Sequence, residues 1–240
     1  MTAAGPAHDA VFGADPTHVR WFTERIVTSL GGADPTRVLD IGCGDGSLLV
    51  RLAEAMPRSS FLGVDLSEGN IAAATAAISR SPDRGRIAVV RDDYMTLDPG
   101  RFDLIVASSS LQGIDASSEQ LAAKIARDAA ADGRLIHVTP YRCFYNMALN
   151  AVRAGLRQAR GTATDRMILS VARILHPGQP DARLRERVDY MYLVLRHYED
   201  GLRDALHARG FHLVATEPAP HTSLGQPKHR LAVMSAPSRA

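Results

Sequence analysis

The chain has 240 residues, and its 28 lysines and arginines against 26 aspartates and glutamates leave a net charge of +2 with histidine neutral. This length fits one large domain or two small ones, and an apolar share of 45% supplies a sizeable core. The apolar runs are too short for a membrane span, and the first residues lack the basic start and apolar block of a secretory signal. Two cysteines suggest neither a disulfide scaffold nor a zinc site. We therefore expect a cytoplasmic protein, and the near-neutral charge gives little attraction to nucleic acid.

Short β-branched runs alternate with helical stretches up to residue 138, which predicts a parallel sheet covered by helices. The expected strands are 37–41, 61–65, 87–90, 102–107 and 134–138. The expected helices are 47–53, 67–78 with Ser67 as N-cap, and 118–130 with Ser118 as N-cap.

The alternation stops at positions 139–210, where the spacing predicts helices. These are 143–160, a helix after Thr164 as N-cap that ends near His176, and 183–209. The expected final strands are 211–216 and 231–235. A connection this long is unusual between strands, which favours a functional role for the insertion.

Glycines cluster where the first expected strand ends, in the sequence VLDIGCGDG at 38–46. Gly42, Gly44 and Gly46 are spaced GxGxG, which differs from the GxGxxG of a dinucleotide site, and no lysine follows as in a Walker loop. Glycine allows a sharp turn and lets a ligand approach the backbone. Asp65 ends the second strand, where a carboxylate can accept both hydroxyls of a ribose.

The motifs VLDIGCGDGSLL, GVDLS, VVRDDY, FDLIVASSS and DGRLIHV resemble the successive motifs of class I S-adenosylmethionine-dependent methyltransferases. GFHLV and HRLAVMS resemble the final antiparallel strands of that family. The resemblance implies one α/β domain over 1–240, a Rossmann-like, doubly wound, seven-stranded sheet of order 3-2-1-4-5-7-6 with the last strand antiparallel. From the helical spacing we also expect a helical cap at 139–200, inserted after the fifth strand, and a helical segment at 1–35.

The resemblance assigns the parts of S-adenosylmethionine to separate residues. The methionine part is assigned to Asp40, Gly42, Cys43, Gly44 and Gly46. The ribose is assigned to Asp65, and the adenine to Leu66, Asp93 and Tyr94. The sulfonium is assigned to Ser108 and Ser109.

Each of these assignments has an alternative in the residues themselves. Asp65 also suits a helix N-terminus, where a carboxylate is favoured by the helix dipole. Asp92 competes with Asp93, either of which also suits a solvated turn, and Cys43 fits its loop as a small packed residue. His18, Trp21, Phe22, Ile26 and Leu30 form a helical stripe that we expect to dock on the sheet or close over the cofactor.

The catalytic base is not identified, because SLQGI at 110–114 lacks the histidines common in small-molecule members of the family. We expect the catalytic residues to be Tyr190, Tyr141, Asn146 and Gln112, without a metal; packing of the tyrosines against the sheet is the alternative. Residues 141–210 carry 12 arginines against 7 acidic residues, which favours an anionic substrate, with solvated arginines as the alternative.

The predicted function is methyl transfer to a small molecule of bacterial secondary metabolism. One alternative keeps the cofactor as the substrate itself, cyclised to azetidine-2-carboxylate with release of methylthioadenosine. An RNA methyltransferase is disfavoured because the sequence has no aromatic-basic motif of an RNA-binding module. A non-catalytic partner subunit is disfavoured because the glycines and both acidic positions are intact. We expect no nucleic-acid or membrane partner, and a homodimer stays open.

Overall fold

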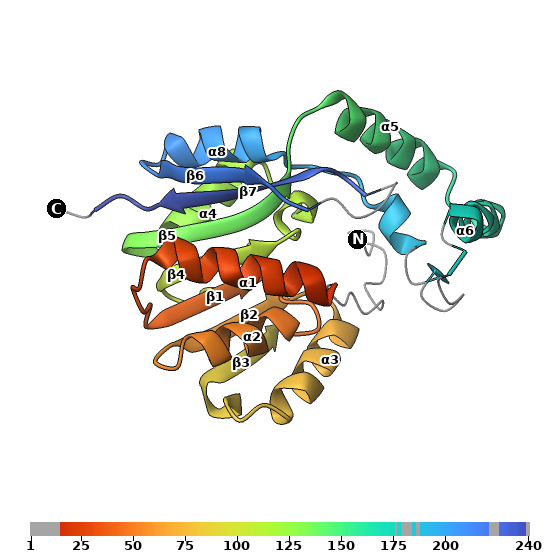
Figure 1. The fold of residues 1–240 in the computed structure, drawn as a ribbon. Coiled ribbons are helices and arrows are strands. Elements are labelled where there is room, and N and C mark those ends of the chain that lie inside the picture. Colours follow the sequence, from red (N-terminus) through yellow and green to blue (C-terminus); the bar gives the residue numbers. More distant parts are fainter. Residues whose placement is uncertain (1–14, 176, 179–183, 186–187, 221–225, 239–240) are drawn as a thin grey trace.

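The strands form one mixed sheet of seven in the order β3-β2-β1-β4-β5-β7-β6, which confirms the predicted topology (Figure 1). β1 to β5 run parallel, and β7 pairs antiparallel with β5 and β6. This computed structural model describes residues 15–175, 177–178, 184–185, 188–220 and 226–238. The strands are β1 (Arg37–Ile41), β2 (Ser60–Asp65), β3 (Ile87–Arg91), β4 (Phe102–Ser108), β5 (Ala129–Pro140), β6 (His212–Pro218) and β7 (His229–Ser235).

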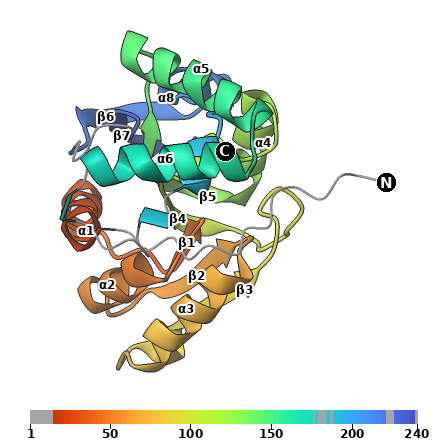
Figure 2. The same ribbon diagram turned by 90° about the vertical axis from the view of Figure 1, so that its right-hand side faces the viewer.

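Helices cover both faces of the sheet, which gives three layers (Figures 1 and 2). Helices α1 to α3 pack on one face, and α4 and α8 pack on the other. The helices are α1 (Pro16–Leu30), α2 (Ser47–Ala55), α3 (Glu68–Ser79), α4 (Ser118–Asp128), α5 (Phe144–Gln158), α6 (Thr162–Leu175) and α8 (Glu199–His207). Short 3₁₀ turns lie at η1 (Arg84–Arg86), η2 (Leu111–Gly113) and η3 (Asp189–Tyr192).

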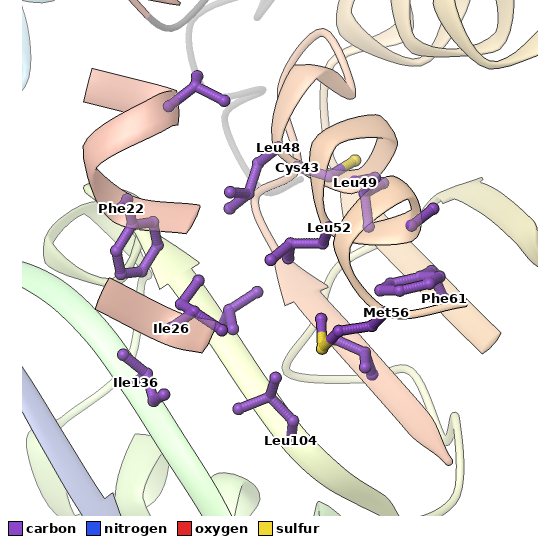
Figure 3. Close-up of a cluster of buried hydrophobic side chains, with 14 of the residues drawn as sticks. Phe22, Ile26, Cys43, Leu48, Leu49, Leu52, Met56, Phe61, Leu104 and Ile136 are labelled. Carbon is purple, nitrogen blue, oxygen red and sulfur yellow. The ribbon is translucent and has the colours of Figure 1, made fainter. Parts of the chain in front are cut away.

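The central strands supply apolar side chains to both cores, because adjacent residues of a strand point to opposite faces. In β1, Val38 belongs to the cluster under α1 and α2, whereas Leu39 belongs to the cluster under α4 and α8. Figure 3 shows the first cluster, in which Phe22 and Ile26 of α1 lie with Leu52 of α2. The sheet is therefore packed on both faces, and these two cores fix the positions of the strand ends from which the loops start.

The N-terminal stripe folds as helix α1 and docks on the sheet. The side chain of Asp15 caps the helix by accepting from the Thr17 amide at 2.7 Å, and Pro16 occupies the first turn. Phe22 and Ile26 are fully buried. In Figure 1 the helix starts at the edge of the sheet where the parallel strands end, which brings its first turn close to the loops of that edge.

Two helices begin at other residues than the spacing predicts. Ser117, rather than Ser118, is the N-cap of α4, because its hydroxyl accepts from the Gln120 amide while the Gln120 side chain accepts from the Ser117 amide. Helix α6 starts at Thr162, two residues before the predicted cap Thr164, whose hydroxyl donates to the Ala159 carbonyl instead. The predicted end at His176 lies outside the described residues.

The single helix predicted at 183–209 is wrong in the described part of that range. The chain forms η3, is neither helix nor strand over 193–198, and becomes helical again only in α8. Backbone groups of the stretch 193–198 bond to distant partners: the Leu195 amide donates to the Asn150 side chain at 2.7 Å, and the Arg196 amide donates to the Gln112 carbonyl at 2.9 Å. These bonds replace the helical ladder. Residues 183, 186 and 187 of the predicted helix lie outside the described ranges.

Helices α5 and α6 lie beyond the edge at which the parallel strands end, on the side of β5 and β7 (Figures 1 and 2). Together with the stretch from η3 to α8 they make up the inserted cap. Among the described residues, no helix combines the length and hydropathy needed to cross a bilayer.

Replacing Phe22 by alanine is expected to lower the free energy of unfolding by about 3–5 kcal/mol, because the ring is fully buried between α1 and the sheet. The matched control is Phe144→Ala, since 89% of the Phe144 side chain is exposed. Urea denaturation followed by circular dichroism measures both variants. Equal destabilisation of the two would contradict the docking of α1.

Candidate functional site

Three neighbouring parallel strands, β2, β1 and β4, end at the same edge of the sheet. Their last residues are Asp65, Ile41 and Ser108. In open α/β sheets, ligands bind in the crevice outside the carboxyl ends of such strands. This edge is therefore the candidate site, and most of the residues that the sequence predicts for it lie there.

The loop after β1 turns on glycines in the left-handed region. Gly42, Gly44 and Gly46 have φ of 72°, 54° and 75°, values that side chains disfavour. Gly42 also lies close to the loop after β4, because a Cβ added there would lie 2.4 Å from the Cβ of Ser110. The Gly42 amide donates to the Val64 carbonyl at 2.8 Å, which holds the turn against β2.

The carboxylate of Asp65 joins the glycine turn to the start of α3. One oxygen accepts from the Gly44 amide at 3.0 Å. The other accepts from the Ser67 amide at 2.9 Å and from the Asn70 side chain at 3.1 Å. Asp65 therefore does stabilise the N-terminus of a helix, as the alternative from the sequence predicts. It also lies at the mouth of the crevice, so the two roles do not exclude each other.

Asp40 is buried behind the glycine turn, with only 1% of its surface exposed. Neither of its carboxylate oxygens has a hydrogen-bond partner among the described residues. Burial raises the pKa of this carboxyl to about 8, and the charges of Asp65 and Asp45 add to the rise. A cationic ligand at this edge would supply the missing counter-charge, so the residues fit a ligand that carries an ammonium group.

Cys43 is packed against β2 rather than presented to the crevice. It is 6% exposed, and a Cβ added at Gly63 would lie 2.8 Å from its sulfur. Burial raises the pKa of the thiol above its ordinary value, and the charge of Asp40 adds to the rise. This favours the packing role left open by the sequence; a direct contact with a ligand stays a prediction.

The residues predicted to face an adenine occupy different surroundings. Leu66 is half exposed at the edge. Asp93 is exposed, and its carboxylate accepts from the Met95 amide at 2.9 Å. The ring of Tyr94, in contrast, is 4% exposed and has the Lys124 ammonium 4.2 Å from its centre. The ring of Tyr94 thus packs in the hydrophobic core, and its predicted place beside the adenine stays a prediction.

Three predicted residues lie at or just after the end of β4. The hydroxyl of Ser108 is 3.0 Å from Nε2 of His18 in α1. Ser109 adopts a φ of 57°, and its amide donates to the Val138 carbonyl at 2.9 Å. The side chain of Gln112 is fully buried and donates to the Ser109 carbonyl, which makes it a support of this turn.

The predicted catalytic residues of the cap are held by other protein groups. The Asn146 amide is fully buried: it donates to the carbonyls of Tyr141 and Lys228 at 2.7 Å each, and it accepts from the Lys228 amide at 2.7 Å. These hydrogen bonds favour a structural role for Asn146, and its catalytic role stays a prediction. The Tyr141 ring has the Arg230 guanidinium 4.7 Å from its centre, and the Tyr190 ring has that of Arg153 at 4.8 Å.

His18 is the site residue that the sequence does not identify. The stripe placed it on α1 but gave no reason to pair it with Ser108, which lies 90 residues further along the chain. The pairing depends on where α1 starts relative to β4, and this is a tertiary property without a local signal.

Residues 38–133, which include the glycine turn, Asp65 and the end of β4, match the family model described as methyltransferase domain. With the 3-2-1-4-5-7-6 sheet, this match decides the family. The chain contains a class I S-adenosylmethionine-dependent methyltransferase domain.

A relative of this methyltransferase domain is the malonyl-[acyl-carrier protein] O-methyltransferase of Geobacter sulfurreducens, 37% identical over 91 residues. Those residues are 37% of this chain and 34% of the relative, so the similarity spans about a third of each.

Solved structures are similar in fold across nearly the whole chain. The N-methyltransferase NodS of Bradyrhizobium japonicum, in complex with S-adenosylhomocysteine, aligns with a TM-score of 0.61 at 16% identity, over 94% of this chain and 90% of that one. The [4+2]-cyclase SpnF aligns with a TM-score of 0.64 at 14% identity, over 98% and 88%. The similarity in fold to these structures therefore extends beyond residues 38–133 to nearly the whole chain.

Gly42→Ala is expected to weaken S-adenosylhomocysteine binding at least about tenfold, because the new Cβ meets Ser110 at a backbone conformation that L-residues disfavour. Calorimetric titration measures the affinity. Gly85→Ala is the control, since a Cβ there has nothing within 4 Å and Gly85 lies before β3 at the opposite edge. Equal binding by both variants would contradict the close approach of the two loops.

Asp40→Asn is expected to be more stable than the unliganded wild type at pH 9 and about equal to it at pH 4. The pKa of Asp40 is raised from 3.8 to about 8 in the folded state, so the unfolded carboxyl ionises first and the wild type loses stability progressively between about pH 4 and pH 8. Urea unfolding at both pH values measures the difference. A stability difference that does not change with pH would show that Asp40 is not the titrating group.

Proposed function

We propose that this protein transfers a methyl group from S-adenosylmethionine to a small-molecule acceptor of bacterial secondary metabolism. The observation that carries the proposal is the buried carboxyl of Asp40, which has no partner among the described residues and lies behind the glycine turn. S-adenosylmethionine carries an ammonium group, and the methyltransferase domain is the setting in which such a ligand is expected. When bound, it supplies an electrophilic methyl group.

We assign the methionine end of the donor to Asp40 and the loop Gly42–Gly46, and the adenine to Leu66 and Asp93. Asp65 would accept the ribose hydroxyls. A carboxylate offers about four acceptor positions, and three protein donors already use this one. Ribose binding is therefore expected to displace one of these donors, and the Asn70 side chain is more easily moved than either backbone amide.

We assign the acceptor to small molecules on the names of two similar proteins. The Geobacter sulfurreducens relative is named for O-methylation of a carrier-bound malonyl group, and the fold neighbour NodS is named for N-methylation. The similarity spans only about a third of that relative, so its name supports the class of acceptor and does not identify the acceptor of this chain.

A second candidate uses S-adenosylmethionine as the substrate itself, closing it to azetidine-2-carboxylate and releasing methylthioadenosine. The fold neighbour SpnF supports this candidate, because it is named for a [4+2] cyclisation, a reaction other than methyl transfer. Incubation with S-adenosylmethionine alone separates the two: methylthioadenosine would support cyclisation. S-adenosylhomocysteine that forms only after acceptors are added would support methyl transfer.

Asp65→Ala is expected to weaken S-adenosylhomocysteine binding about 10- to 100-fold, because the ribose hydroxyls lose a charged acceptor. Calorimetric titration measures the change. Asp103→Ala is the matched control, since Asp103 also accepts from two backbone amides, those of Thr36 and Arg37 at 2.9 Å, but at the opposite edge of the sheet. No binding by the wild type would refute the proposed function, and an equal loss in both variants would refute the role of Asp65.

A further inference from the structure

His18 lies at the candidate site, although the proposed function gives it no role. Its Nε2 is 3.0 Å from the hydroxyl of Ser108, the last residue of β4. Helix α1 starts at the edge where the parallel strands end (Figure 1), so this histidine belongs to its first turn at the crevice. The segment after β4 contains no histidine, and α1 brings one to the end of that strand.

The surroundings of His18 favour its neutral form. The rings of Trp21 and Phe22 have their centres 5.4 and 6.2 Å from the imidazole, and burial lowers the pKa of His18 below its ordinary value of 6.5. The charge of Asp15, at the N-cap of α1, opposes this shift. Ser108, Trp21 and Phe22 carry no charge, so at neutral pH the ring is available to accept a proton.

The hydroxyl that faces His18 is held at a fixed place. Ser109, the next residue, has a φ of 57°, and its amide is bonded to the Val138 carbonyl of β5. Left-handed backbone at a residue other than glycine costs energy and persists where the surroundings enforce it, often at functional sites. Gln112 bonds to the Ser109 carbonyl and adds to this support.

We propose that Ser108 and His18 form a proton relay for an acceptor whose nucleophile is a hydroxyl or an amine; this rests on the proposed function. The nucleophilic atom bonds to the methyl carbon while the carbon–sulfur bond breaks and leaves its electron pair on sulfur. The proton of the nucleophile passes to the Ser108 oxygen, and the Ser108 hydroxyl proton passes to Nε2 of His18. Ser108 touches the acceptor, and His18 acts through it.

The relay narrows the substrate class. A carboxylate is already deprotonated at neutral pH and needs no proton acceptor, whereas a phenol, an alcohol or an ammonium group does. The acceptor is therefore a hydroxyl or amine compound, and the excess of arginines in the cap does not require an anionic one.

The first test is acceptor-independent and uses the complex with S-adenosylhomocysteine. In ¹⁵N-histidine-labelled protein, with the His18 signals assigned by their loss in His18→Gln, the relay requires Nε2 to be unprotonated at pH 8. A proton on Nε2 of the neutral ring would overturn the relay, because that nitrogen could not accept one from Ser108.

The second test is kinetic, with methyl-labelled donor and a panel of phenols, alcohols, primary amines and carboxylic acids. His18→Gln keeps a side-chain nitrogen near Ser108 but cannot take up a proton, so kcat is expected to fall about 100-fold or more, with S-adenosylhomocysteine affinity within about twofold of wild type. The wild type should lose kcat at acidic pH, at a pH below the ordinary histidine pKa of 6.5, and this loss should disappear in the variant. Ser108→Ala should lower kcat similarly.

His207→Gln is the matched control, because His207 is exposed at the end of α8. It should keep both the rate and the pH profile of the wild type. Unchanged kcat and pH profile in His18→Gln, or methylation of carboxylic acids alone, would overturn the relay while leaving the methyltransferase function intact. Failure of the wild type to bind S-adenosylhomocysteine would instead refute the proposed function.

Discussion

The carboxylate of Asp65 is the contact on which the rest of the site depends. It ends β2 and accepts at once from the glycine turn after β1 and from the first residues before and within α3. Two strand ends and a helix start are thus fixed by one side chain, with the Gly42 amide bonded to β2 as a second link. Because three charge-assisted bonds converge on it, the shape of the crevice is set before any ligand arrives.

Three acidic residues surround the same glycine turn, and they differ in the number of hydrogen-bond donors that they accept from. Asp65 is satisfied by three donors, and Asp45 accepts from the amide and hydroxyl of Ser47 at 3.1 and 2.7 Å. Asp40 has no partner in the described residues, and burial together with its two acidic neighbours favours its neutral form. Close carboxylates repel each other, and Asp40 has no hydrogen-bond donor among the described residues to offset this repulsion. A cationic ligand would offset it, so this arrangement favours a cationic ligand.

The sequence predicts the parts of this molecule that local rules determine. The β1 strand, the glycine turn and Asp65 follow from period, φ requirements and position at a strand end, whereas the sheet order is implied by the resemblance of the motifs to a known family. The pairing of His18 with Ser108 and the non-helical stretch 193–198 do not, because long-range bonds to β4, α5 and η2 determine them. Leu195 fits an apolar spacing typical of a helix because its side chain is buried, although its backbone is not helical.

The cap shows why its charge alone does not identify the substrate. Arg142 and Arg160 lie over the rings of Tyr198 and Tyr192, with their guanidinium carbons 5.5 and 4.8 Å from the ring centres. Both arginines are also paired with carboxylates, those of Asp200 and Asp189. Rings that already hold a guanidinium on one face, and arginines that already hold a carboxylate, stabilise the cap itself. The selectivity of the site is therefore expected to come from the strand ends, where Asp40 and the hydroxyl of Ser108 lie, more than from the charge of the helices above them.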